Sequence, residues 1–155
     1  MSAARANATT RGMNLYGNNS AVDVFLVTTS PDVYVRESNR PDVNAFAWGQ
    51  CAPSGITVTF GGSDSTHTRW CKPQYVYWNT WSVAAGKVNT AAKYNYIGCH
   101  ESGHTVGLRH RAQGANSCMV AALTGPADPN SVVPGIQNPQ ASDYDRLDNH
   151  VLDYP

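Results

Sequence analysis

The sequence predicts an α+β fold, in which a mixed, twisted β-sheet packs on a central helix and a second helix closes the C-terminus. β-Branched and aromatic runs occupy the chain up to Thr80, and helix-forming residues follow a capping position at Asn89 or Thr90. After a capping pattern at Ser142, apolar residues recur on one face of a final helix, at Tyr144, Leu147, Val151 and Tyr154. With 155 residues, the chain is expected to form one domain, residues 1–155.

The N-terminal part contains a predicted inner strand. Residues 1–10 are rich in Ala and are expected to form either the last turns of a helix or a frayed tail. Val22–Thr29 is almost continuously apolar after Asp23, which is typical of a strand covered on both faces. Turn residues flank the next segment, so residues 33–38 are expected to form a loop with at most a short extended piece.

Three further strands are predicted before the central helix. Asn44–Cys51 alternates larger side chains (Asn44, Phe46, Trp48 and Gln50) with small ones, and this pattern favours an edge strand. A turn at Pro53–Gly55 is expected to separate it from a short strand at Ile56–Phe60. Gln74–Thr80 is an aromatic and β-branched strand that leads towards the helix.

The central helix carries the pattern HExxHxxGxxH, from His100 to His110. His100 and His104 are one turn apart on the same helix face, so their imidazoles can share one metal ion. Gly107 can adopt the positive φ that ends the helix and brings His110 back as a third ligand. Three protein nitrogens leave a fourth position open, which is typical of a catalytic zinc site. The alternative is that the histidines are ordinary surface residues and the glycine a plain helix cap.

Glu101 indicates the chemistry of this site. Zinc lowers the pKa of a bound water towards about 7, and Glu101 is placed to take its proton as the water attacks a peptide carbonyl. The sequence therefore predicts a Zn²⁺-dependent endopeptidase with Glu101 as general base. Two alternatives stay open: a zinc hydrolase of other amides or esters, and a secreted, zinc-stabilised binding domain without proteolytic activity. An acid beside an open coordination position favours an enzyme.

The composition argues against several partners. Charged residues make up 14% of the chain and the formal net charge is zero, so neither nucleic acid nor an anionic membrane is an expected partner. No apolar run reaches membrane-spanning length, and residues 1–20 lack the apolar core of a signal peptide. The expected partner is a polypeptide substrate, bound by a monomer.

Four cysteines form an even set without a CxxC pair: Cys51, Cys71, Cys99 and Cys118. They favour disulfides and a secreted, extracellular protein over four buried thiols in a cytosolic one, although three pairings are compatible with the sequence.

The histidine pattern with a later methionine resembles the metzincin clan of zinc endopeptidases, and is most similar to small secreted bacterial members with a matrixin-like layout. Met119 lies nine residues beyond His110, where the clan's methionine turn would pass beneath the metal. The resemblance implies an upper part up to about Gly107 and a lower part from Leu108 to Pro155. If the turn lies beneath the helix, Cys99 and Cys118 are natural partners, and Cys51 would pair with Cys71.

The resemblance also carries expectations about the sheet. Met13–Gly17 and Val22–Thr29 look like the clan's second and third strands, so the usual first strand and most of the first helix would be absent. Either the chain starts late or its N-terminal part is reduced. The substrate would add as an antiparallel strand to the edge-strand residues Ala45, Phe46, Ala47, Trp48 and Gly49, for which an ordinary hairpin strand is the alternative. Val120–Ile136 would wall the pocket for the side chain after the scissile bond, with an apolar preference expected. Some families of the clan have a tyrosine two residues after the methionine, where this chain has Ala121.

Overall fold

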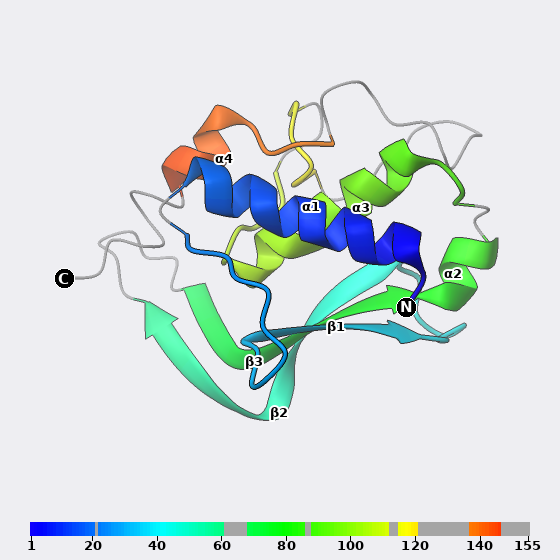
Figure 1. The fold of residues 1–155 in the computed structure, drawn as a ribbon, viewed down its shortest axis with the longest axis horizontal. Coiled ribbons are helices and arrows are strands. Elements are labelled where there is room, and N and C mark those ends of the chain that lie inside the picture. The colour runs from blue at the N-terminus through cyan, green and yellow to red at the C-terminus, as the bar shows by residue number, and fades with distance from the viewer. Residues whose placement is uncertain (21, 61–67, 86–87, 112–114, 121–136, 147–155) are drawn as a thin grey trace.

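The protein combines helices with a small mixed sheet, in agreement with the predicted α+β class. The computed structural model describes residues 1–20, 22–60, 68–85, 88–111, 115–120 and 137–146, and of residues 53–60, 68–71 and 146 the backbone alone. Its elements are α1 (Ala3–Asn19), β1 (Val33–Ser38), β2 (Ala47–Phe60), β3 (Thr68–Asn79), α2 (Thr80–Ala85), α3 (Ala91–Thr105) and α4 (Ala141–Arg146) (Figure 1).

The three strands lie in the order β1-β3-β2. β1 is parallel to β3, whereas β2 is antiparallel to β3 and lies at the edge of the described sheet, as the alternation predicted. β2 is one strand of 14 residues. The residues Pro53–Gly55 fall where its pairing register shifts, between Cys51 and Ile56, so the predicted turn is an irregularity within one strand.

The two long helices cover one face of this sheet (Figure 1). Because side chains alternate along a strand, Val76 and Trp78 point towards the helices, where both are fully buried. The indole Nε1 of Trp78 donates to Thr9 Oγ1 of α1 at 3.0 Å. The opposite face carries a row of stacked rings from all three strands: Tyr34, Tyr75, Tyr77 and Trp48, with neighbouring ring centres 5.2–5.7 Å apart.

Phe46 and Trp48 therefore do not share a face, which corrects the predicted alternation. Trp48 stacks on Tyr77 on the outer face, while Phe46, directly before β2, packs against the core beneath α3. The regular alternation begins at Ala47, because Phe46 lies outside the paired strand.

α1 and α3 touch through their backbones. A Cβ on Gly12 would lie 2.5 Å from the carbonyl oxygen of Gly98, and a Cβ on Gly98 would overlap the carbonyl oxygen of Ala8. Ser102 Oγ, one turn further along α3, donates to Thr9 O at 3.4 Å. Paired glycines let the helices approach this closely, so α1 forms a fixed support for the helix that carries the histidines.

The N-terminal part differs from the prediction. The expected strand Met13–Gly17 is wrong, because these residues belong to α1, and a first helix of 17 residues is present. Gly, Thr and Asn give the segment a weak helix propensity, but packing on α3 outweighs it. Ala8, Thr9, Gly12 and Tyr16 form the buried stripe of α1.

Val22–Thr29 is not an inner strand. Its described residues form no strand or helix, and Phe25 and Leu26 are 77% and 96% exposed. The strand lies instead at Val33–Ser38, where the sequence predicts a loop with at most a short extended piece. The charged residues Arg36 and Glu37 interrupt the alternation of apolar and polar residues that would indicate a strand. Parallel pairing with β3 supplies the hydrogen bonds that define β1.

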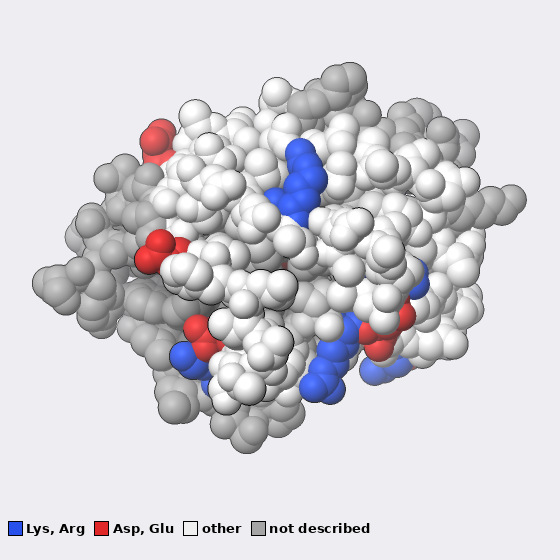
Figure 2. Space-filling model, viewed as in Figure 1, with Lys and Arg blue, Asp and Glu red and all other residues white. Residues whose placement is uncertain are grey.

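Charges on the surface are sparse. On the face drawn in Figure 2, basic and acidic side chains lie as separate spots of mixed sign. Two exposed ion pairs, Arg40 with Asp42 and Lys72 with Asp32, contribute little to stability because water screens them. Among the described helices, none combines the length and apolarity that a membrane crossing requires.

Candidate metal centre

The helix α3 begins and ends as its sequence predicts. Thr90 is the N-cap, and its side chain accepts a hydrogen bond from Lys93 N at 3.3 Å. The helix ends at Thr105, and Gly107 takes a φ of 92°, which confirms the role expected of this glycine. Leu108 N donates back to Gly103 O at 2.9 Å, and this reversal returns the chain towards the helix.

The turn brings three histidines together. The Nε2 atoms of His100, His104 and His110 are 3.1–3.2 Å from one another. His100 is buried, His104 half-buried and His110 exposed, so the cluster opens to solvent on the His110 side. These three side chains could hold a metal ion, as the sequence predicted.

Backbone carbonyls set the tautomers of two of these rings. His100 Nδ1 lies 2.8 Å from Cys118 O, and His104 Nδ1 lies 2.8 Å from Leu108 O. A carbonyl can only accept, so each Nδ1 carries the proton and each Nε2 presents a lone pair. Two lone pairs facing each other at 3.1 Å repel unless a cation lies between them. The hydrogen bonds therefore prepare the rings for a metal and hold their orientation.

Burial keeps the imidazoles of His100 and His104 uncharged. Burial, and next the neighbouring His104, lowers the pKa of His100 to about 4. The pKa of His104 is lowered as well, again chiefly by burial. Both imidazoles are therefore neutral near pH 7, which is the form that binds a metal.

Glu101 lies beside the histidines in an apolar setting. It is 6% exposed, and burial raises the pKa of its carboxyl group to about 8. Burial, and next the charge of Glu101, raises the pKa of the Tyr96 hydroxyl to about 12. A divalent cation nearby would favour the ionised form and counteract the effect of burial.

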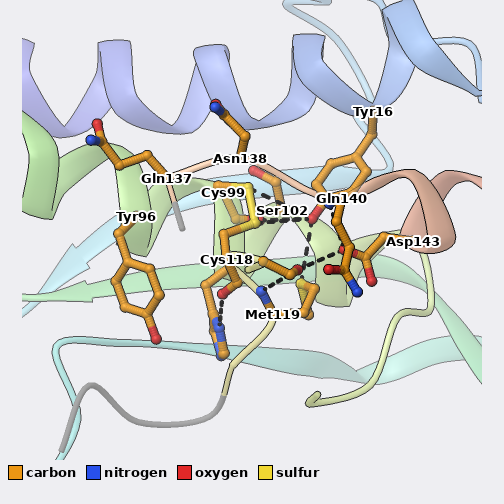
Figure 3. The surroundings of a disulfide bond; sticks show 12 residues. Tyr16, Tyr96, Cys99, Ser102, Cys118, Met119, Gln137, Asn138, Gln140 and Asp143 are labelled. Carbon is orange, nitrogen blue, oxygen red and sulfur yellow. Dashed lines mark hydrogen bonds between the residues drawn. A yellow bond between two sulfur atoms is a disulfide. The ribbon is translucent and has the colours of Figure 1, made fainter. Parts of the chain in front are cut away.

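Met119 lies in a tight turn beneath α3, fully buried (Figure 3). Ser117 Oγ accepts from Met119 N at 3.0 Å, and Ser117 O accepts from Val120 N at 3.3 Å. Arg111 N, next to the third histidine, donates to Met119 O at 2.7 Å. The turn thus joins the segment carrying His110 to the floor of the site.

A disulfide links the same turn to α3. Cys99 and Cys118 are bonded, as the resemblance implied (Figure 3). Cys99 precedes His100 in the chain, and the carbonyl of Cys118 accepts the His100 Nδ1 proton. Cys51 is also disulfide-bonded. The side chain of Cys71, its expected partner, lies outside the described residues.

No family model, curated protein or solved structure matches this chain. The interpretation of the site therefore depends on its own residues and geometry.

Asp143 of α4 holds the turn from below, a role that the sequence did not indicate. It is 1% exposed, and its carboxylate accepts from Arg111 Nε at 2.7 Å, Ser117 Oγ at 2.6 Å and Gln140 N at 2.9 Å. One carboxylate therefore ties together α4, the segment after His110 and the methionine turn. α4 begins at Ala141, one residue before the predicted cap Ser142.

Tyr16 and Gly103 are further contributors that sequence reasoning missed. The Tyr16 hydroxyl, from α1, donates to Met119 Sδ at 3.3 Å and lies 3.3 Å from Cys99 O. A Cβ on Gly103 would overlap Met119 Sδ, so this variable position of the motif must be small for the methionine to pack beneath the helix. Neither residue has a local signal, because both act through distant contacts.

The residues expected to bind substrate lie near the start of β2. Ala47 to Gly49 belong to this edge strand, and Ala45 and Phe46 precede it. Phe46 O accepts from Asn79 N at 2.8 Å, so the segment is anchored to the end of β3. Most of the expected pocket wall, residues 121–136, lies outside the described residues, as do Leu147, Val151 and Tyr154.

Proposed function

We propose that this chain is a zinc-dependent endopeptidase, similar in its site to the metzincins. The observation that carries the proposal is the triangle of Nε2 atoms with two tautomers set by backbone carbonyls. Four tetrahedral ligands at Zn–N distances of about 2.0–2.1 Å are separated by roughly 3.3 Å. The separations of 3.1–3.2 Å fit that geometry, with a fourth position free on the exposed side.

The donor set also favours zinc over harder cations. Magnesium and calcium prefer oxygen ligands, whereas three neutral imidazoles suit zinc and its neighbours in the first transition row. When bound there, zinc supplies an acidified water and polarises the carbonyl of the substrate.

The residues of the chain perform the remaining steps. Glu101 follows His100 on the helix and accepts a proton from the attacking water, then returns it to the leaving amine. Its buried, apolar surroundings hold a carboxyl group whose affinity for the proton is high enough for this exchange. In the sheet formed by the described residues, β2 is an edge strand, and an extended substrate can add to such an edge by main-chain hydrogen bonds.

The test is cleavage of a permanently unfolded protein, such as reduced and carboxymethylated casein, by the zinc-loaded chain. We expect cleavage to stop with a chelator and to return with zinc. In Glu101→Gln the cleavage rate should fall by about a hundredfold to ten-thousandfold, which is the usual contribution of a general base. Glu37→Gln is the matched control, because Glu37 is the only other glutamate in the chain and binds the N-terminal segment.

The zinc content of the same samples should be measured, so that an absence of cleavage can be told apart from an absence of bound zinc. Stoichiometric zinc in the wild-type chain without any cleaved peptide bond would remove the peptidase proposal and favour a zinc-stabilised binding domain. Cleavage that persists in Glu101→Gln would remove the role of Glu101 as base.

A further inference from the structure

Lys93, in the first turn of α3, places a buried ammonium group among aromatic rings. The residue is 4% exposed, and Nζ lies 5.4 Å from the ring centre of Phe46 and 5.2 Å from that of Tyr96. None of the ion pairs found in the described part of the chain includes it. Burial lowers the pKa of this amine.

This position is costly for a positive charge. Burial removes hydration, and the first turn of a helix carries the positive end of its dipole, which repels a cation. The cation–π contacts with the two rings offset only part of this cost. A lysine in such surroundings is suited to receive an anion from outside the chain.

The ammonium group is close to the candidate metal centre. Lys93, Tyr96 and His100 lie at helical spacing on the same face of α3, and the ring centres of Tyr96 and His100 are 5.8 Å apart. Seven residues of helix separate Lys93 from His100 by about 10 Å. An extended substrate advances by about 3.3 Å per residue. One such step from the scissile bond, together with the length of an acidic side chain, covers most of the distance between His100 and Lys93.

The relative direction of β2 and α3 determines which end of an added substrate would reach Lys93. Phe46, directly before β2, contacts Lys93 at the start of α3. Cys51, further along β2, pairs with Gln74, whose amide donates to Thr105 O at the end of α3. β2 and α3 therefore run in the same direction, with the histidines towards the Cys51 end. A substrate antiparallel to β2 passes the histidines first and then reaches Lys93, with its C-terminal residues.

We propose that Lys93 selects substrates with a carboxylate just C-terminal to the scissile bond, either an Asp or Glu side chain or a free chain terminus. This inference depends on the peptidase function proposed above and names its substrate class. It departs from the apolar preference that the family resemblance implied, because an apolar side chain that reached Lys93 would leave the ammonium group unpaired.

The activity test compares matched peptides that differ only after the scissile bond. We expect kcat/KM to be at least tenfold higher for Glu than for Gln, which is the effect of a charge-assisted hydrogen bond. Lys93→Met keeps the unbranched stem and should bring the Glu to Gln ratio to about one, whereas Lys93→Arg should retain a preference. Lys72→Met is the control, since Lys72 is an exposed lysine paired with Asp32.

A binding test separates this inference from the peptidase proposal. Fluorescent Glu and Gln peptides are titrated against zinc-loaded Glu101→Gln and against Glu101→Gln with Lys93→Met. Tighter binding of the Glu peptide, lost with Lys93, supports the carboxylate site even if no cleavage is seen. Equal binding of both peptides overturns it, as does cleavage with equal rates. Peptides ending in a free acid or an amide after the same residue show which source of carboxylate is preferred.

Discussion

Replacing Asp143 by Asn should loosen the site without altering any metal ligand. The carboxylate accepts three hydrogen bonds, one of them from the Arg111 guanidinium, and it is 1% exposed. Asn fills the same volume but carries no charge, and its NH₂ group must face one of these donors. Removing one partner of a buried ion pair costs about 3–5 kcal/mol. Because the Arg111 side chain is 26% exposed and keeps part of its hydration, we expect a loss of about 2–4 kcal/mol.

Urea unfolding of the metal-free protein, followed by circular dichroism, measures this loss. The matched control is Asp42→Asn, because the Asp42 side chain is 61% exposed in its pair with Arg40 and water screens that pair, so its contribution to stability should be much smaller. Zinc affinity, measured by competition with a chromophoric chelator, should fall about tenfold or more in Asp143→Asn, since outer partners position the ligands. If Asp143→Asn matched Asp42→Asn in stability and the wild type in zinc affinity, Asp143 would not hold the methionine turn against the histidines.

Three further changes test the helix crossing, the metal and the corrected N-terminal segment. Gly98→Ala should destabilise the protein by about 2 kcal/mol in urea unfolding despite the better helix propensity of Ala, because its methyl group meets the backbone of Ala8. The control Gly49→Ala, where an added Cβ has nothing within 4 Å, should be nearly neutral. Equal losses of stability in the two variants would argue against the close helix crossing. Zinc at 100 times its Kd should add about 2.7 kcal/mol to the free energy of unfolding and raise Tm by roughly 5–10 °C over the chelated protein, whereas magnesium should not. An unchanged Tm in calorimetry would contradict a zinc site. Leu26→Ser should alter stability by less than about 0.5 kcal/mol, since Leu26 is 96% exposed, whereas a loss of 3 kcal/mol or more would place it in the core after all.

The histidines of the candidate metal centre could be predicted because their signal is local. A spacing of four on a helix brings His100 and His104 together, and one glycine with positive φ returns His110. Cys118 and Met119 were found through the family resemblance. The support of this turn could not be predicted in the same way. Met119 N donates to Ser117 Oγ, and Ser117 Oγ donates to Asp143, which lies far along the chain, so no sequence spacing encodes the second bond.

The N-terminal errors have the same physical origin. Val22–Thr29 has the composition of a buried strand, but composition does not state whether a partner strand is available, and Leu26 remains exposed. Conversely, α1 has a poor helix sequence that succeeds because Gly12 meets Gly98 of α3. In both cases tertiary contacts, which a single sequence does not display, decide the outcome.

The Cys99–Cys118 bond has a consequence for where the centre can assemble. The disulfide and the hydrogen bond from His100 to the Cys118 carbonyl close one small ring, which contains a histidine of the candidate metal centre and the group that orients it. Reducing conditions open this ring, so the carbonyl is no longer covalently held beside the imidazole. The candidate metal centre should therefore form most readily where disulfides persist, and less readily where they are reduced.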